Sequence, residues 1–419
     1  MLQKLRVSGF KSLADVSVEF PRMSVLFGPN SAGKSNLLDA IQALSRIGTE
    51  RTLMDALDGR MIRGYTFELF ALPHGGISGL ASKPSTQFSL ESELTIPDGR
   101  NGRQGSYRYQ VDVEIEYRSG ALTNRGEYLC ALSAAGEPKG QPAIEAKNGQ
   151  LSVRRQNGGG RPRIEQLGLN YAILSDARLA SPAYKYIERA RSELQNWRAY
   201  YLDPRMAMRA EMPPMDVPDI GVFGQYIVPF LYKLKREHPK HFEAVRRTVR
   251  TIIPSISKLD VNLDKHRGTL DFFIQQNNIT FSSRVVSEGT LRVLALCALS
   301  VNPWNGSLLA FEEPENGVHP RRVELIAKML TSLALDQRRQ VVVTTHSPLF
   351  CDAMLKEARS RGTEEIGLFN VRRDGAGTTV ERFDTHGPLF DDPEIAEALS
   401  MPVEDHLFES LILSGIIDE

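Results

Sequence analysis

The decisive stretch near the start of the chain reads Val25-Leu-Phe-Gly-Pro-Asn-Ser-Ala-Gly-Lys-Ser-Asn36. It fits the spacing G-x-x-x-x-G-K-S/T, with the fixed positions taken by Gly28, Gly33, Lys34 and Ser35. The two glycines permit backbone torsions that a Cβ would obstruct, so the loop can wrap around a phosphate chain. In such a loop the lysine reaches the β- and γ-phosphates, and the serine hydroxyl binds Mg²⁺.

The residues around this loop separate two interpretations. A glycine-rich turn before a helix needs no ligand, whereas a nucleotide-binding loop lies between a buried strand and a helix. Met23 to Phe27 is a short apolar run typical of a buried strand, and residues 36–44 carry apolar side chains at helical spacing. The required order is present, so the sequence predicts nucleotide binding. The residues expected to hold the nucleotide are Pro29, Asn30, Ser31, Ala32, Gly33, Lys34, Ser35 and Asn36.

The composition is that of an ordinary globular chain. Of 419 residues, 41% are hydrophobic and 24% are charged, and the length suffices for two or three compact units. Lys plus Arg equals Asp plus Glu at 51 each, so net charge neither supports nor excludes contact with nucleic acid. Cys130, Cys297 and Cys351 are far apart, which argues against a structural zinc site and fits a reducing cytosol. We find no secretory signal and no apolar run of membrane-spanning length, so we expect a cytoplasmic protein without membrane contact.

Hydrophobic periodicity predicts the remaining elements. The expected strands are an antiparallel pair within 1–20 and single strands at 67–70, 87–94, 107–117, 259–263, 270–274 and 279–281. The expected helices are one from Ala183 to Leu202 and two over 222–253 that are split near His238-Pro239. A Gly-rich tip at residues 157–160 is flanked by arginines. Those arginines are either solvated or available to a phosphate backbone.

The second half of the chain contains three further motifs. Ser287-Glu-Gly-Thr290 opens an apolar helix, and Leu308 to Phe311 is a buried strand that ends in Glu312-Glu313. A last strand over 340–345 is followed by His346. Beside a phosphate-binding loop, Glu312 is placed to join the Mg²⁺ shell, and Glu313 to polarise a water for in-line attack on the γ-phosphate. The histidine would lie at the carboxyl edge of a parallel sheet, where α/β proteins bind ligands, and could hydrogen-bond the γ-phosphate.

Each of these motifs also has a purely structural interpretation. Glutamates at a strand end are often solvated, and a lone histidine there is usually structural or exposed. The nucleotide loop favours the functional interpretation of Glu312 and Glu313. For Ser287, Glu288 and Gly289 both interpretations stay open, because a helix start can bind an anion but can also be a simple cap.

The order of the four motifs resembles that of the ABC-type ATPases, and the details resemble the soluble branch with SMC-, RecF- and OLD-type proteins. The resemblance covers roughly residues 1–75 and 255–385. It implies an α/β fold: an ABC-type ATPase head, with a mixed or parallel sheet that carries the P-loop, a flanking antiparallel β lobe, and an inserted β-rich and helical segment. The expected division is an N-terminal part of the head over 1–75, a β-rich lobe with helical insertion over 76–255, a C-terminal part of the head over 256–385, and a tail over 386–419 that could dock a partner.

The resemblance also implies a homodimer, or a higher homo-oligomer of dimers, that closes around two ATP molecules. Lys34, Ser35, Glu312, Glu313 and His346 would act from one subunit, with Lys34, Glu313 and His346 as catalytic residues and Ser35 and Glu312 as Mg²⁺ ligands. Ser287, Glu288 and Gly289 would contact ATP held by the other subunit, and the D-loop segment 316–319 would cross the interface. Gln110 and Gln87 are the candidates for the Q-loop glutamine.

Two differences between this sequence and the family reduce the number of functions to consider. The long coiled coil of SMC proteins is absent, and the roughly 70 residues after His346 contain no Asp-x-Asp pair of a Toprim nuclease domain. Effector chemistry would therefore come from another protein. The sequence predicts a Mg²⁺-dependent ATPase whose dimerisation regulates or scaffolds a separate nuclease or toxin encoded nearby, as in bacterial phage defence. The alternatives are a RecF- or SMC-like ATPase that binds DNA in repair or maintenance, and a scaffold with nearly silent turnover.

Overall fold

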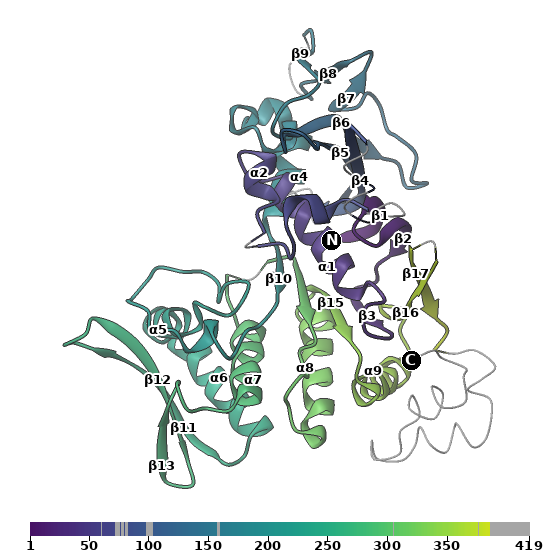
Figure 1. The fold of residues 1–419 in the computed structure, drawn as a ribbon. Coiled ribbons are helices and arrows are strands. Elements are labelled where there is room, and N and C mark those ends of the chain that lie inside the picture. The colour runs from purple at the N-terminus through teal and green to yellow at the C-terminus, as the bar shows by residue number, and fades with distance from the viewer. Residues whose placement is uncertain are drawn as a thin grey trace. The chain divides into compact units, whose positions relative to one another are not determined.

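The computed structural model describes residues 1–59, 61–71, 76, 79, 83–97, 104–156, 160–304, 306–375 and 377–385. The chain forms two compact units, each built from segments that are distant in the sequence (Figure 1). The first unit contains residues 1–21, 29–197 and 370–381, and the second contains 22–28, 198–369 and 382 onward. The predicted tail over 386–419 and the tip at 157–159 lie outside the described residues.

The first unit is built on an eight-stranded antiparallel sheet with the order β2-β1-β4-β5-β6-β7-β8-β9. Its strands are β1 Leu2–Phe10, β2 Leu13–Glu19, β4 Ser85–Pro97, β5 Gln104–Glu116, β6 Leu122–Leu132, β7 Ile144–Lys147, β8 Gln150–Val153 and β9 Arg163–Gln166. In β4 and β5 buried residues alternate with half-exposed ones, so the predicted period of two is confirmed. One face of the sheet is therefore apolar and the other polar.

Within its described residues the first unit also contains helices α1 Lys34–Ile47, α2 Leu53–Ala56 and α4 Lys185–Gln195, and several short 3₁₀ turns. The predicted helix after the P-loop is confirmed, and its apolar residues are buried. The helix predicted from Ala183 to Leu202 is wrong in its second half. The backbone leaves the helix at Asn196, and the aromatic-rich segment that follows forms β10, Trp197–Tyr200.

The strand predicted at residues 67–70 is also wrong, because Thr66–Leu69 forms a 3₁₀ turn. The Glu68 carboxylate accepts a hydrogen bond from the backbone N–H of Tyr65 at 2.7 Å, which closes the turn on itself. Local side-chain bonding thus overrides an apolar alternation that is only four residues long.

The second unit is built on a six-stranded sheet with the order β10-β14-β15-β3-β16-β17. Its strands are β3 Met23–Phe27, β14 Leu308–Glu312, β15 Gln340–Thr345, β16 Ile366–Asp374 and β17 Gly377–Phe383, with β10 at the edge. The three strands β14, β15 and β3 are parallel, and Phe27 lies beside Thr345 while Glu312 lies beside Thr344. The carboxyl ends of all three strands therefore meet at one edge of the sheet, where the chain also leaves β3 for the P-loop.

Helices with an apolar face form part of the core of the second unit (Figure 1). They are α5 Ile227–Glu237, α6 Pro239–Ile252, α7 Glu288–Ser300, α8 Val323–Leu335 and α9 Pro348–Arg361. Helices α8 and α9 pack against the parallel strands, and α5 and α6 pack against β11 Ile256–Asp264, a strand of a separate small sheet. The predicted split near His238-Pro239 is confirmed, since the proline occupies the first position of α6, where its missing N–H costs nothing. Cys297 is fully buried in α7. No helix in the described part of the chain is long and apolar enough to cross a membrane.

A small antiparallel sheet completes the second unit. Its strands β11 Ile256–Asp264, β12 Thr269–Gln276 and β13 Ile279–Ser282 confirm the strands predicted over 259–281. The fold class predicted from the sequence is therefore confirmed: an α/β chain with a parallel central sheet and an antiparallel lobe.

Candidate nucleotide-binding site

The P-loop connects β3 to α1 through a backbone with left-handed torsions at both of its fixed glycines. Gly28 and Gly33 have φ angles of 142° and 110°, in the region that a Cβ disfavours. Lys34 begins α1 and is 5% exposed, and its Nζ donates to the carbonyl oxygen of Pro29 at 2.7 Å. The ammonium group therefore lies over the loop, where a phosphate chain would need a cation.

Two side chains provide the oxygen chemistry that Mg²⁺ prefers. The Ser35 hydroxyl is half-exposed in the first turn of α1, and within the described part of the chain it makes no hydrogen bond. The carboxylate of Glu312 ends β14 at the sheet edge toward which β3 also points. A hydroxyl and a carboxylate fit a hard divalent cation, so the residues predicted as Mg²⁺ ligands have suitable chemistry. Ser35 belongs to the first compact unit and Glu312 to the second.

Glu313 leaves the sheet in a different direction from Glu312. Its φ of 44° is unusual for a residue with a side chain, and such torsions cost about 1–3 kcal/mol. Its backbone N–H still bonds the Thr344 carbonyl at 3.0 Å, so the strand ends with the turn held in place. The Glu313 Oε1 lies 2.9 Å from Nδ1 of His346, which directly follows β15 and is exposed. The structure therefore brings together two of the three predicted catalytic residues.

Glu315 was not predicted, yet it lies buried behind this pair. One carboxyl oxygen accepts from the hydroxyl of Thr345, and the other finds no hydrogen-bond partner among the described residues. Burial raises the pKa of Glu315 to about 7, although the Thr345 bond opposes the shift. An orphan oxygen in an apolar setting fits a protonated carboxyl group. Nothing in the Glu-Glu-Pro-Glu run distinguishes this glutamate from the others before the fold is known.

Glu315 predicts a pH dependence of stability. Its pKa is about 7 in the folded chain, against an ordinary value of 4.5, so the folded state binds more protons than the unfolded state between these values. Stability is then highest below pH 4.5 and falls by on the order of 2–3 kcal/mol as pH rises to about 7. Urea unfolding of wild type and Glu315→Gln at several pH values measures this. As pH rises, wild type should lose unfolding free energy relative to Glu315→Gln. A difference between the two proteins that is constant with pH would contradict the raised pKa of Glu315. Glu364→Gln, at an exposed glutamate, is the control.

The start of α7 and the segment that follows Glu315 form one packed surface. Ser287 caps α7 by accepting from the N–H of Thr290 at 3.3 Å. A Cβ on Gly289 would come within 2.0 Å of the Gly317 carbonyl oxygen, so only glycine allows this approach. A hollow of about 420 Å³ lies over this contact, and it is lined by Ser287, Gly289, Thr290, Val293, Gly317, Val318, His319 and Arg322. The predicted signature residues and the predicted D-loop thus share one site.

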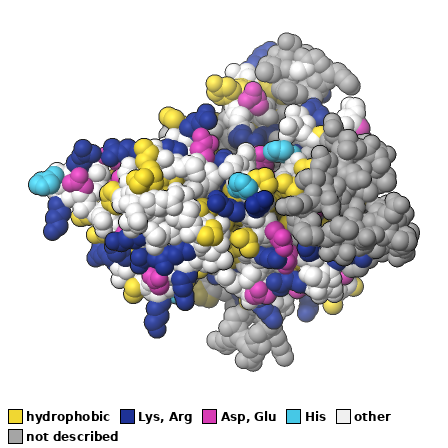
Figure 2. Space-filling view, turned by 90° about the horizontal axis from the view of Figure 1, so that it is seen from below, with side chains coloured by type: hydrophobic (Ala, Val, Ile, Leu, Met, Phe, Trp, Pro, Cys, Tyr) yellow, Lys and Arg dark blue, Asp and Glu magenta, His cyan; other side chains and the backbone are white. Residues whose placement is uncertain are grey.

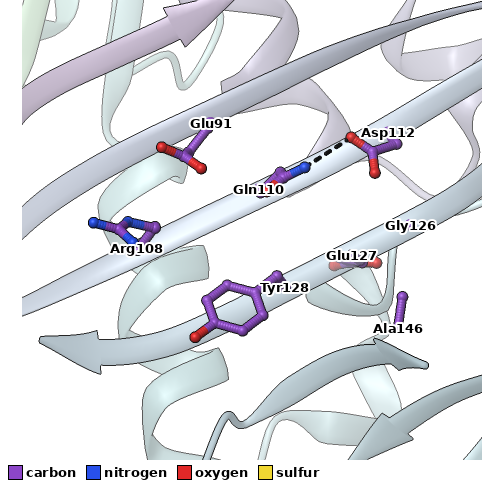
Figure 3. A pocket seen from close by; sticks show the side chains of 8 residues that line it. All are labelled: Glu91, Arg108, Gln110, Asp112, Gly126, Glu127, Tyr128 and Ala146. Carbon is purple, nitrogen blue, oxygen red and sulfur yellow. Dashed lines mark hydrogen bonds between the residues drawn. The ribbon is translucent and has the colours of Figure 1, made fainter. Parts of the chain in front are cut away.

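A second hollow lies on the polar face of the first unit's sheet (Figure 3). Gln110, one candidate for the Q-loop glutamine, lies in it and donates to Asp112 at 3.0 Å and to Ser89 at 3.4 Å. Gln87, the other candidate, is exposed on β4. These hydrogen bonds hold the Gln110 side chain on the polar face of the sheet. Its role as a Q-loop residue stays a prediction.

A family model described as "AAA domain, putative AbiEii toxin, Type IV TA system" matches residues 23–352, which is most of the chain. The chain belongs to this family. The matched range contains the P-loop, the signature, the Glu312-Glu313 pair and His346, the four features on which the resemblance rests.

This AAA-family protein is similar to curated proteins of the branch that the motifs indicated. It is 27% identical over 180 residues to the DNA replication and repair protein RecF of Synechocystis, covering 37% of this chain and 44% of that protein. It is 29% identical over 124 residues to "Retron Ec83 probable ATPase" of Escherichia coli, covering 27% of this chain and 22% of that protein. The chain thus spans less than half of the length of these relatives.

A solved structure supports the same fold for this family member. The SMC head bound to the C-winged helix domain of ScpA superposes with a TM-score of 0.52, covering 91% of this chain and 98% of the head at 14% identity. The chain therefore belongs to the AAA family of the matching model and shares the fold of an SMC head, and its similarity to RecF agrees with the resemblance found in the sequence.

Proposed function

We propose that this chain hydrolyses ATP with Mg²⁺ and that Glu313 is the group that polarises the attacking water. The contact of 2.9 Å between Glu313 and His346 carries the proposal. It lies at the sheet edge where parallel strands end and where β3 passes the chain to the P-loop. A carboxylate oriented by a histidine can accept a proton from water during in-line attack.

The other predicted residues fit roles around the phosphates. The N–H groups of loop residues 29–36 would surround the phosphate chain, and the Lys34 ammonium would neutralise its negative charge. Ser35 and Glu312 would hold Mg²⁺, which when bound offsets charge on the β- and γ-phosphate oxygens. His346 would keep the Glu313 carboxylate in place through the bond at 2.9 Å.

The surface at the start of α7 is the reason to propose two cooperating copies. A helix N-terminus with the exposed hydroxyl of Ser287 offers donors to an anion, and Gly289 lets the D-loop segment pack against it. In the proposed homodimer this surface contacts the γ-phosphate of ATP held by the other copy. ATP would then bridge the copies, and its hydrolysis would release them. Dimers could associate further into a larger homo-oligomer.

For the biological role we propose regulation of a separate effector, a nuclease or toxin, in bacterial phage defence. The likeness to a retron ATPase and the toxin named in the family description support this choice. The test is co-expression with the product of the adjacent gene. A defined complex whose effector activity changes with ATP would support the role. A neighbour that neither co-purifies nor responds to ATP would contradict it.

The second candidate is a RecF-like ATPase that binds DNA, favoured by the likeness to the Synechocystis protein. Figure 2 shows basic side chains interrupted by acidic ones on the face in view, rather than one continuous basic surface. For the regulatory role we expect no ATP-dependent binding of DNA. Titration of duplex DNA at several salt concentrations, with and without ATP, separates the two. ATP-dependent affinity with a steep salt dependence would favour the RecF-like role.

A further inference from the structure

A chain of hydrogen bonds supports the P-loop from outside. The Asn36 side-chain amide donates to the Ser12 Oγ at 2.7 Å, and this oxygen lies 2.7 Å from the Oγ1 of Thr378. The Thr378 hydroxyl in turn donates to the carbonyl oxygen of Ala32 at 2.8 Å. These residues come from α1, from the turn between β1 and β2, and from β17, and all belong to the first unit.

The direction of this relay follows from counting protons. Each hydroxyl has one proton to donate, and that of Thr378 is used on Ala32. Ser12 must therefore donate to Thr378, and it accepts from Asn36. The relay runs one way from amide to carbonyl, with every hydroxyl both donating and accepting. Bonds arranged in this way strengthen one another inside a protein.

The last bond of the relay sets the orientation of one peptide group in the P-loop. The Ala32–Gly33 peptide is trans, so its carbonyl oxygen and its N–H point to opposite sides. With the carbonyl held by Thr378, the Gly33 N–H points away from Thr378. Loop N–H groups are what a P-loop presents to phosphate.

Close packing shows that this contact is specific. Thr378 is 4% exposed, and its own N–H bonds the carbonyl of Ser12 at 2.9 Å. A Cβ on Gly33 would come within 2.1 Å of the Thr378 Oγ1. At the other end of β17, Phe383 packs edge-on against Phe27, with ring centroids 5.9 Å apart.

We propose that Ser12 and Thr378 are positioning residues for nucleotide binding. They hold the Ala32–Gly33 peptide so that its N–H faces the phosphates of ATP. This inference rests on the proposed function, because it requires that the loop binds ATP.

The test compares Thr378→Val with Thr378→Ser. Valine keeps the shape but removes the donor, so we expect the Kd and KM for ATP to rise about tenfold, the loss of one good hydrogen bond to a charged group. The kcat should stay within about twofold, because the N–H contacts phosphate in both the ground state and the transition state. Serine keeps the hydroxyl and should restore both constants. Thr379→Val, at the exposed neighbour on β17, should match wild type.

Nucleotide affinity is measured by displacement of a fluorescent ATP analogue, alongside steady-state turnover and thermal unfolding. Wild-type Kd and KM in Thr378→Val, even with a lowered Tm, would overturn the inference. If that variant does not fold, Ser12→Ala takes its place, and wild-type affinity there would overturn it equally. Failure of the wild type to bind ATP would refute the proposed function itself, a result distinct from equal binding by wild type and variant.

Discussion

Glu313→Gln is expected to lower ATP turnover by about a hundredfold to a thousandfold while ATP binding stays within about twofold of wild type. The amide has the same shape and its oxygen can still meet the His346 ring, so the local structure should survive. What it loses is the ability to take a proton from the attacking water. Steady-state phosphate release and nucleotide affinity, measured on the same preparation, separate these two effects.

The same variant should prolong the ATP-bound assembly, because the bridging charge is no longer removed. Size-exclusion chromatography with ATP should then show a larger species that wild type forms only transiently. Glu364→Gln, at an exposed glutamate far along the chain, should behave as wild type in both assays. Unchanged turnover in Glu313→Gln would show that the catalytic assignment is wrong, and would favour a scaffold in which hydrolysis plays no part.

The fold around the site could be predicted because it rests on local patterns. The strand at Met23–Phe27 and the strand at Leu308–Glu312 are continuous apolar runs, as strands buried on both faces require. The helix Lys34–Ile47 repeats apolar residues at helical spacing after a motif with fixed glycines. Each of these signals lies within one short stretch, so no knowledge of the tertiary structure is needed.

The wrong end of the predicted helix and the two residues that the sequence did not reveal have a common cause, namely contacts between segments that are distant in the sequence. The helix expected to reach Leu202 ends at Gln195, where aromatic residues join a sheet edge. Thr378 lies 346 residues from Ala32, and no motif marks it as a partner of the P-loop. Glu315 is buried and Glu313 is not, and no sequence pattern marks that difference. Tertiary packing decides all three cases, and local propensity is silent on them.

A mixture of two inactive variants should recover activity, since each proposed site draws on both copies. Lys34→Ala removes the phosphate-binding cation, and Gly289→Ala forces a Cβ to within 2.0 Å of the Gly317 carbonyl and displaces the D-loop. Each variant alone should lose about a hundredfold in turnover. In a mixed dimer one site contains both substituted residues, and the other site contains neither of them. With random pairing, about a quarter of all sites are then intact.

The matched control is a mixture of Lys34→Ala with Glu313→Gln. Both changes affect the half of the site that a copy provides for its own ATP, so every site in a mixed dimer remains defective. Turnover is measured after the variants are mixed and allowed to exchange. Recovery with Gly289→Ala but not with Glu313→Gln is the expected result. If neither mixture exceeds the sum of its parts, the signature surface does not act on a second copy, and each chain would have to complete its own site. The pair of mixtures therefore distinguishes residues that act within one copy from those that act across two.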